Sequence, residues 1–149
     1  MENIMKIRRM REEDVEKVAA LEAQIFTKPW SYKSFMDSLC LPNAIYVVAL
    51  KNEEVLGYCG LYCILNEASI TNVAVKEDVR NMGIGYGMMK ELLYEAKHKG
   101  MEAATLEVRK SNEAAIHLYE QLGFENSGIR KDFYSEPKED AVIMWKHNL

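Results

Sequence analysis

Proline and cysteine are both scarce in this chain of 149 residues, which has three of each. The prolines fall between segments of regular hydrophobic spacing, so no proline-rich linker divides the chain, and we expect a single domain over residues 1–149. The cysteines form no Cys-x-x-Cys pair and cannot all be paired, which favours free thiols in a reducing compartment. The histidines show no ligand spacing either, so no metal site is predicted.

Long apolar runs and an excess of positive charge are also lacking. No stretch approaches the roughly 20 apolar residues of a membrane span, and no basic segment followed by an apolar one opens the chain. We therefore expect a cytoplasmic protein without membrane contact. With 19 basic and 23 acidic residues the net charge is −4, so direct nucleic-acid binding is not expected, whereas basic substrates would be attracted.

The spacing of the apolar residues predicts an α+β protein. Strands are expected at residues 5–10, 44–50, 55–65, 68–75, 104–108, 125–133 and 141–146. Helices are expected from residue 12 to before Pro29, from Ser31 to residue 39, from residue 88 to 99, and over 112–122. These segments amount to seven strands and four helices, with short connections that favour antiparallel neighbours in the first half.

A glycine-bearing loop at residues 80–87 joins a predicted strand to a predicted helix. Backbone N–H groups at such a junction can point at a phosphate, and the helix end carries partial positive charge, although a plain tight turn is the structural alternative. A P-loop is excluded because Met88 follows Gly87 where Lys is needed. A dinucleotide-binding loop stays open, since Glu107 has the spacing of a ribose-binding acid. Against it, three closely connected strands precede the loop, and its glycines read Gly-x-Gly-x-Gly.

Residues 80–85 read Arg-Asn-Met-Gly-Ile-Gly, which resembles the coenzyme A motif of the Gcn5-related N-acetyltransferase (GNAT) superfamily. The order of the predicted elements is also similar to that superfamily over nearly the whole chain. Residues 106–124 and Pro29-Trp30-Ser31 resemble the bacterial branch that acetylates the N-terminal alanine of a small-subunit ribosomal protein. The resemblance implies a GNAT-like fold, with a mixed sheet splayed between its fourth and fifth strands, and acetyl-CoA as co-substrate.

The resemblance also implies how acetyl-CoA would bind. The main chain of Val73, Ala74 and Val75 would pair with the pantetheine arm as an added strand, because amide groups of the arm can bond to a strand edge. Asn112 would contact the coenzyme near the thioester, and it is also a good helix N-cap, so both roles stay open. The pyrophosphate would lie on the glycine loop, made of Arg80, Asn81, Met82, Gly83, Ile84, Gly85, Tyr86 and Gly87.

Aminolysis of a thioester needs a neutral amine, a polarised carbonyl and a proton for the leaving thiolate. The resemblance makes Glu107 the general base, directly or through water, and Tyr119 the general acid. The structural alternatives are an exposed strand-end acid or a salt bridge to Arg109 for Glu107, and an ordinary core tyrosine for Tyr119. A backbone N–H of residues 73–75 is the candidate for polarising the carbonyl. At pH 7 about a tenth of an α-amine is neutral but only about 0.04% of a lysine, so a lone glutamate favours an N-terminal acceptor.

Trp30 and Tyr134 look like acceptor-pocket residues by the same resemblance, although a large aromatic residue in a loop can simply cover the edge of a core. Phe133 stands where that branch has a second tyrosine. The acidic loop 136–140 would suit basic residues behind the acceptor's N-terminus, with a solvated loop as the alternative. We expect a monomer or weak dimer that acetylates a protein N-terminus. A lysine or small-amine acetyltransferase and a non-catalytic acyl-CoA sensor are the alternatives.

Overall fold

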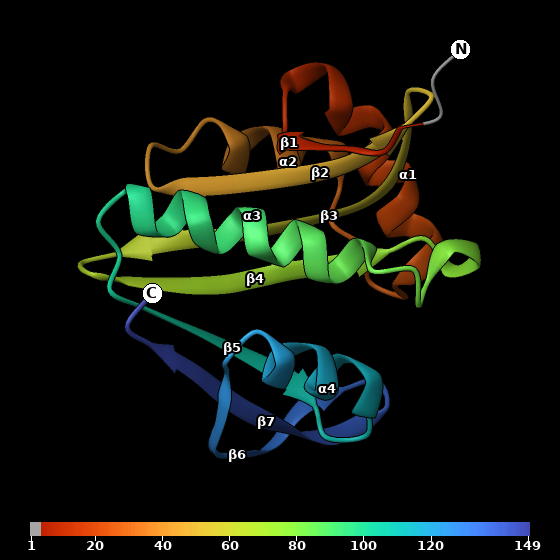
Figure 1. The fold of residues 1–149 in the computed structure, drawn as a ribbon. Helices are drawn as coiled ribbons and strands as arrows, with labels where there is room; N and C mark the ends of the chain where they lie inside the picture. The colour runs from red at the N-terminus through yellow and green to blue at the C-terminus, as the bar shows by residue number, and fades with distance from the viewer. Residues whose placement is uncertain (1–3) are drawn as a thin grey trace.

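The computed structural model describes residues 4–149, which build a seven-stranded sheet with helices on both faces (Figure 1). The strands are β1 Lys6–Arg9, β2 Ala44–Lys51, β3 Glu54–Ile64, β4 Glu67–Val75, β5 Ala103–Arg109, β6 Glu125–Ser135 and β7 Lys138–His147. The helices are α1 Val15–Ile25, α2 Tyr32–Leu39, α3 Ile84–His98 and α4 Glu113–Gln121, with 3₁₀ turns η1 Glu12–Asp14 and η2 Glu77–Val79. The prediction of a mixed sheet with seven strands and four helices is confirmed.

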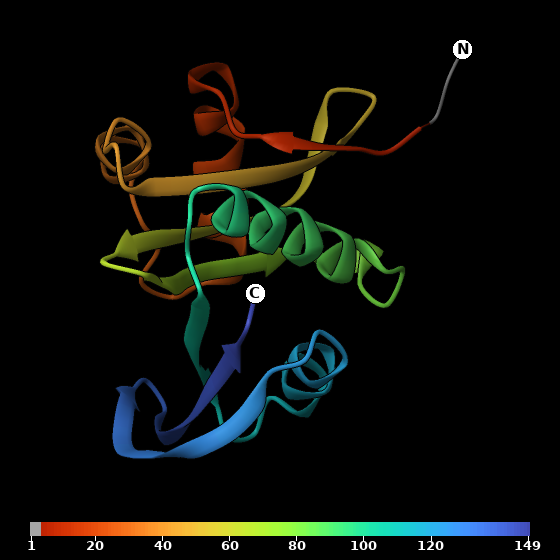
Figure 2. The same ribbon diagram turned by 60° about the vertical axis from the view of Figure 1, so that its left-hand side comes forward.

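The strand order is β1-β2-β3-β4-β5-β7-β6, and its parallel pair is β4 with β5. That pair holds only over residues 67–69 and 103–105. Beyond it the two strands diverge, and Figure 2 shows β5, β6, β7 and α4 separating from β4 and α3. The predicted splay between the fourth and fifth strands is therefore confirmed, and it leaves one edge of β4 without a partner strand from residue 70 onward.

Two apolar clusters hold the helices on opposite faces of the sheet. On one face α3 buries Met88 and Leu92 against the strands, and α4 joins the same cluster through Tyr119. On the other face α1 and α2 pack around Phe35 and Tyr58 (Figure 1). Because side chains alternate along a strand, each residue near the splay faces either the α3–α4 side or the α1–α2 side.

α3 begins at Ile84, so Gly85 and Gly87 lie in its first turn rather than in the predicted loop. Because glycine is unfavourable inside a helix, the helix was predicted to start later, at residue 88. Here side chains from neighbouring elements come close to both glycines. A Cβ on Gly87 would lie 2.8 Å from the Cδ1 of Ile7, and one on Gly85 would lie 3.1 Å from the Cδ2 of Leu118.

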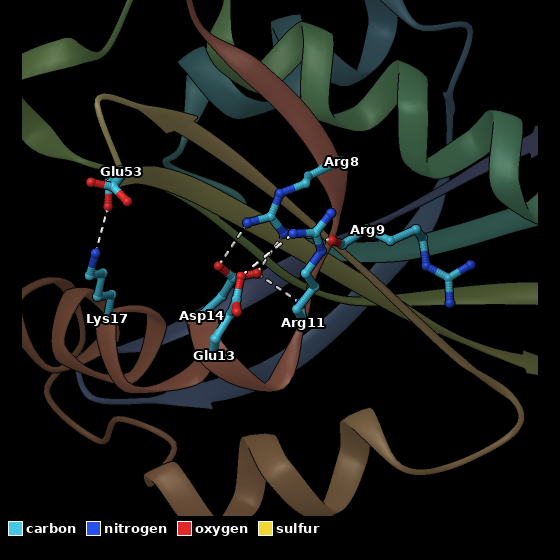
Figure 3. A network of polar contacts seen from close by, with 7 residues as sticks. All are labelled: Arg8, Arg9, Arg11, Glu13, Asp14, Lys17 and Glu53. Carbon is cyan, nitrogen blue, oxygen red and sulfur yellow. Dashed lines mark hydrogen bonds and ion pairs between the residues drawn. The ribbon is translucent and has the colours of Figure 1, made fainter.

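A network of charged side chains fastens β1 to the start of α1 (Figure 3). The Arg8 guanidinium donates to both carboxylate oxygens of Asp14, at 2.7 and 3.0 Å, and the backbone N–H of Arg11 donates to Asp14 at 2.8 Å. Lys17 Nζ donates to the carbonyl of Glu53 at 2.7 Å, which ties α1 to the β2–β3 turn. A cavity of about 680 Å³ opens beside the network, and no site residue expected from the sequence lines it.

Neither a membrane helix nor a metal centre is found in the described part of the chain. Within residues 4–149 no helix is both long and apolar enough to cross a bilayer. The same residues contain no cluster of three or more His, Cys, Asp or Glu side chains placed to hold a metal ion.

Candidate active site

The loop before α3 has the geometry of an anion site. Gly83 is the N-cap of α3 with a φ of 81°, a left-handed conformation that favours glycine, and no side chain caps this helix end. A Cβ at Gly83 would meet nothing within 4 Å, so the space in front of the helix is open. The first N–H groups of a helix have no acceptor inside it and point into that space. The loop therefore fits a pyrophosphate.

Arg80 connects this loop to the end of β4. Its Nε donates to the carbonyl oxygen of Val75 at 3.0 Å, which ties this exposed side chain to the end of β4. Asn81 adopts a left-handed φ of 65°, which turns the chain toward α3. Met82 and Tyr86 are exposed beside the open helix end. The predicted loop residues thus lie together at the N-terminal end of α3, and the Arg80 side chain ties them to β4.

Val73, Ala74 and Val75 form the end of β4, beyond the last pairing with β5. Ala74 is buried on the α1–α2 side, whereas Val73 and Val75 pack against the α3–α4 side. The edge of this segment toward β5 has no strand partner, so main-chain N–H and C=O groups there can pair with an extended ligand. The arrangement fits the amide-bearing pantetheine arm.

Asn112 is the N-cap of α4, and its Oδ1 accepts from the backbone N–H of Ala115 at 3.2 Å. The capping role is therefore confirmed. The side chain is exposed, and among residues 4–149 its Nδ2 has no hydrogen-bond partner. That amide group remains free to donate to a ligand, which leaves the second predicted role open.

Glu107 lies on β5 and faces the α1–α2 side, since its sequence neighbours face the α3–α4 cluster. Its side chain is 29% exposed, and Oε2 lies 3.3 Å from the Nε of Arg130 on β6. Within the described residues the other oxygen makes neither an ion pair nor a hydrogen bond. The expected alternative, a salt bridge to Arg109, is wrong, because Arg109 pairs with Glu139 at 3.2 Å.

Tyr119 approaches the splay from the opposite face. It is 7% exposed in the α3–α4 cluster, with its ring edge-on to Phe124 at 6.1 Å, so it is a core residue. Burial raises the pKa of its hydroxyl, and Cys59 and Tyr134 raise it further. The hydroxyl is therefore protonated at neutral pH and is a proton donor in its chemistry. Tyr119 can therefore be both a core residue and a proton donor.

Tyr134 lies on β6, with the Arg109 guanidinium over its ring. Burial raises its pKa, the Arg109 guanidinium opposes that effect, and the charge of Glu107 adds to it. Because Tyr134 also raises the pKa of Tyr119, it is within electrostatic range of both Glu107 and Tyr119. Phe133 beside it is exposed, with the two rings edge-on at 5.0 Å. The structure thus gathers the predicted base, acid and one acceptor residue at the splay.

Arg109 contacts the acceptor region, although the sequence interpretation named it only as a possible ion-pair partner of Glu107. Its guanidinium lies 4.3 Å from the ring centre of Tyr134 and donates to the carbonyls of Glu136 and Pro137 at 3.1 and 2.9 Å. It therefore fixes the β6–β7 turn that follows Tyr134. Its position two residues after Glu107, on the same face of the strand, was the available signal.

The acidic side chains of loop 136–140, which were predicted to receive basic residues of the acceptor, are paired with other groups of this chain. Glu139 accepts from the backbone N–H of Ser111 at 2.7 Å as well as from Arg109. Glu136 pairs with Lys28 at 3.4 Å. This last contact joins the α1–α2 loop to the β6–β7 turn, so Trp30, which lies on the α1–α2 loop, borders the same side of the sheet as Glu107 and Tyr134.

Comparison with known proteins places this geometry in a family. Residues 11–124 match the model of the acetyltransferase (GNAT) family. The chain belongs to the GNAT family. It is 39% identical over 140 residues to the putative ribosomal protein bS18-alanine N-acetyltransferase of Bacillus subtilis strain 168, with 93% of each chain covered. It is 33% identical over 126 residues to the ribosomal protein bS18-alanine N-acetyltransferase of Escherichia coli K12, covering 83% and 84%.

Solved structures agree with the sequence relatives. The crystal structure of the ribosomal-protein-S18-alanine N-acetyltransferase from Escherichia coli superposes with a TM-score of 0.88 at 30% identity, covering 97% of this chain and 94% of that one. This GNAT protein is an N-acetyltransferase that uses acetyl-CoA, as predicted. The dinucleotide-binding alternative is set aside, because β2, β3 and β4 before the loop are antiparallel, whereas that motif begins with a parallel βαβ unit.

Proposed function

We propose that this enzyme acetylates the N-terminal α-amine of a protein, and that the acceptor is the N-terminal alanine of ribosomal protein bS18. The observation that carries the proposal is Glu107, a carboxylate with one free oxygen, on the side of the splay bordered by Trp30 and Tyr134. A glutamate can take a proton from an α-amine of pKa about 8 far more readily than from a lysine near 10.4. The activity in the relatives' names supports the same acceptor.

In this proposal the chain's residues divide the proton transfers between two faces of the sheet. Bound acetyl-CoA supplies an acetyl thioester. Glu107 takes the proton of the attacking amine as the C–N bond forms, and Tyr119 gives its proton to sulfur as the C–S bond breaks. A backbone N–H on the unpaired edge of residues 73–75 polarises the carbonyl oxygen. Afterwards Glu107 releases its proton to solvent and Tyr119 regains one.

The same proposal assigns the binding roles. The main chain of residues 73–75 pairs with the pantetheine arm, residues 80–87 hold the pyrophosphate, and the free amide of Asn112 contacts the arm near the thioester. The acceptor enters between Trp30 and Tyr134. Support comes from the open helix end at Gly83, the unpartnered edge of β4 and the ion pair that brings the two acceptor elements together.

Initial rates of coenzyme A release test the acceptor class. One peptide begins with a free alanine followed by basic residues, and its matched partner is α-blocked with a free lysine. We expect turnover with the free N-terminus alone. Turnover with the lysine peptide alone would contradict the proposal. No coenzyme A release with either peptide, despite measurable acetyl-CoA binding, would point to a small amine as the acceptor.

A further inference from the structure

Glu22 is a buried carboxylate outside the catalytic pair. It lies in the last turn of α1, is 4% exposed, and is surrounded by the apolar cluster of the α1–α2 face. Burying a carboxylate is unfavourable unless hydrogen bonds compensate, and the negative end of a helix dipole adds to the cost. The hydrogen bonds of Glu22 should therefore show what offsets these two unfavourable effects.

Both oxygens of Glu22 are occupied, and the two donors come from different elements. Oε2 accepts from the backbone N–H of Trp30 at 2.9 Å, and Oε1 accepts from the hydroxyl of Tyr58 on β3. The backbone carbonyl of Glu22 also accepts from the N–H of Phe26 at 3.0 Å. Glu22 therefore fixes the α1–α2 loop at its start, through Phe26, and again four residues later, through Trp30.

The loop held in this way borders the acceptor opening. The Trp30 ring packs on Phe35 at 5.3 Å, and Lys28, two residues earlier, reaches Glu136 of the β6–β7 turn. An apolar residue of similar size at position 22 would fill the core, but it would leave the Trp30 N–H and the Tyr58 hydroxyl without their acceptor, which is unfavourable for buried donors. In particular, an apolar residue cannot accept a hydrogen bond from the Trp30 N–H.

We infer that Glu22 is a positioning residue for the acceptor, because it holds Trp30 and its loop in the conformation that receives the N-terminal segment. This inference rests on the proposed function. If the competent loop conformation were populated only a tenth of the time, the apparent affinity for the acceptor would fall about tenfold. Binding of acetyl-CoA, on the unpaired edge of β4 and the loop before α3, would not change.

Three variants separate loop positioning from core packing. Glu22→Leu removes both acceptors and should raise KM for the alanine peptide about tenfold, with kcat and KM for acetyl-CoA within about twofold of wild type. Glu22→Gln should restore the acceptor KM, because its carbonyl oxygen can accept from Trp30 while its amide donates to the Tyr58 hydroxyl. Tyr58→Phe is the matched control, since it removes the other partner of Glu22 and leaves the Trp30 bond in place.

A second readout needs no acceptor. The chain has two tryptophans, so in a Trp145→Phe background acrylamide quenching reports on Trp30 alone, and Glu22→Leu should increase it while Tyr58→Phe does not. Unchanged quenching, or equal rises in acceptor KM for Glu22→Leu and Tyr58→Phe, would overturn the inference. If wild-type enzyme fails to use the alanine peptide, the proposed function fails, and quenching still decides the role of Glu22.

Discussion

Glu107 has two carboxylate oxygens but, within residues 4–149, one ion-pair partner, and this imbalance is why we propose it as the general base. Arg130 is 57% exposed, so its ion pair with Glu107 is screened by solvent and contributes little to stability. An incoming α-ammonium can therefore replace Arg130 at low cost. Burial raises the pKa of the Tyr119 hydroxyl and keeps it protonated, so it holds the proton that the proposal assigns to sulfur.

Substituting Glu107 and Tyr119 one at a time should test whether they are the general base and the general acid. Glu107→Gln keeps the shape but cannot take a proton, and we expect kcat/KM for the alanine peptide to fall by about 10² to 10⁴. Tyr119→Phe should lower it by about 10² or more for loss of the acid. Steady-state rates measure both, and calorimetry should find acetyl-CoA affinity within about twofold of wild type. If Glu107→Gln lowers kcat/KM by less than about fivefold, its assignment as the base is contradicted.

At the scale of elements, α1 depends on Asp14. This buried carboxylate accepts from the Arg8 guanidinium and from the Arg11 N–H, so β1, η1 and α1 meet at one side chain (Figure 3). Burial alone would raise the pKa of Asp14, but the hydrogen bonds from Arg8 and Arg11 outweigh it, and the net shift is downward. The native state therefore favours the ionised form.

Asp14→Asn should destabilise the protein by about 2 kcal/mol at pH 7, through loss of charge-assisted hydrogen bonds at a partly exposed pair. Because the folded pKa is depressed, this contribution is present above the unfolded value of 3.8 and disappears as the pH falls through the folded pKa. Urea unfolding at pH 7 and at pH 3 would measure it. Glu13→Gln, at the exposed neighbour, is the control and should have little effect at either pH.

How far the sequence predicts these elements depends on the range of the contacts involved. Strands and helices follow local periodicity, so those of residues 4–149 were all located, and the motif at residues 80–85 marked the loop that we propose for the coenzyme. The start of α3 was misplaced because glycine is locally unfavourable in a helix, whereas Gly87 lies in the first turn of α3 close to Ile7, which is far away in the sequence. The contacts of Glu22 and Arg109 were missed for the same reason, since their partners at Tyr58 and Pro137 come together only in the fold.

For the whole molecule, the sheet consists of two parts joined by a short parallel pairing of β4 with β5. The groups proposed to hold acetyl-CoA lie on both parts, with the β4 edge and the start of α3 on one and Asn112 of α4 on the other (Figure 2). A ligand that binds the folded sheet and not the unfolded chain should stabilise the native state by an amount set by its concentration relative to its Kd.

Acetyl-CoA at 100 times its Kd should therefore stabilise the native state by about 2.7 kcal/mol, which corresponds to a rise in Tm of roughly 5–10 °C for a chain of this size. Hydrogen exchange should slow at residues 73–75, at the first turn of α3 and at the start of α4. Pantetheine alone lacks the pyrophosphate, so it should protect the β4 edge and leave α3 unprotected. Protection centred on the cavity beside Arg8 would instead place the coenzyme on β1 and would overturn the proposed site.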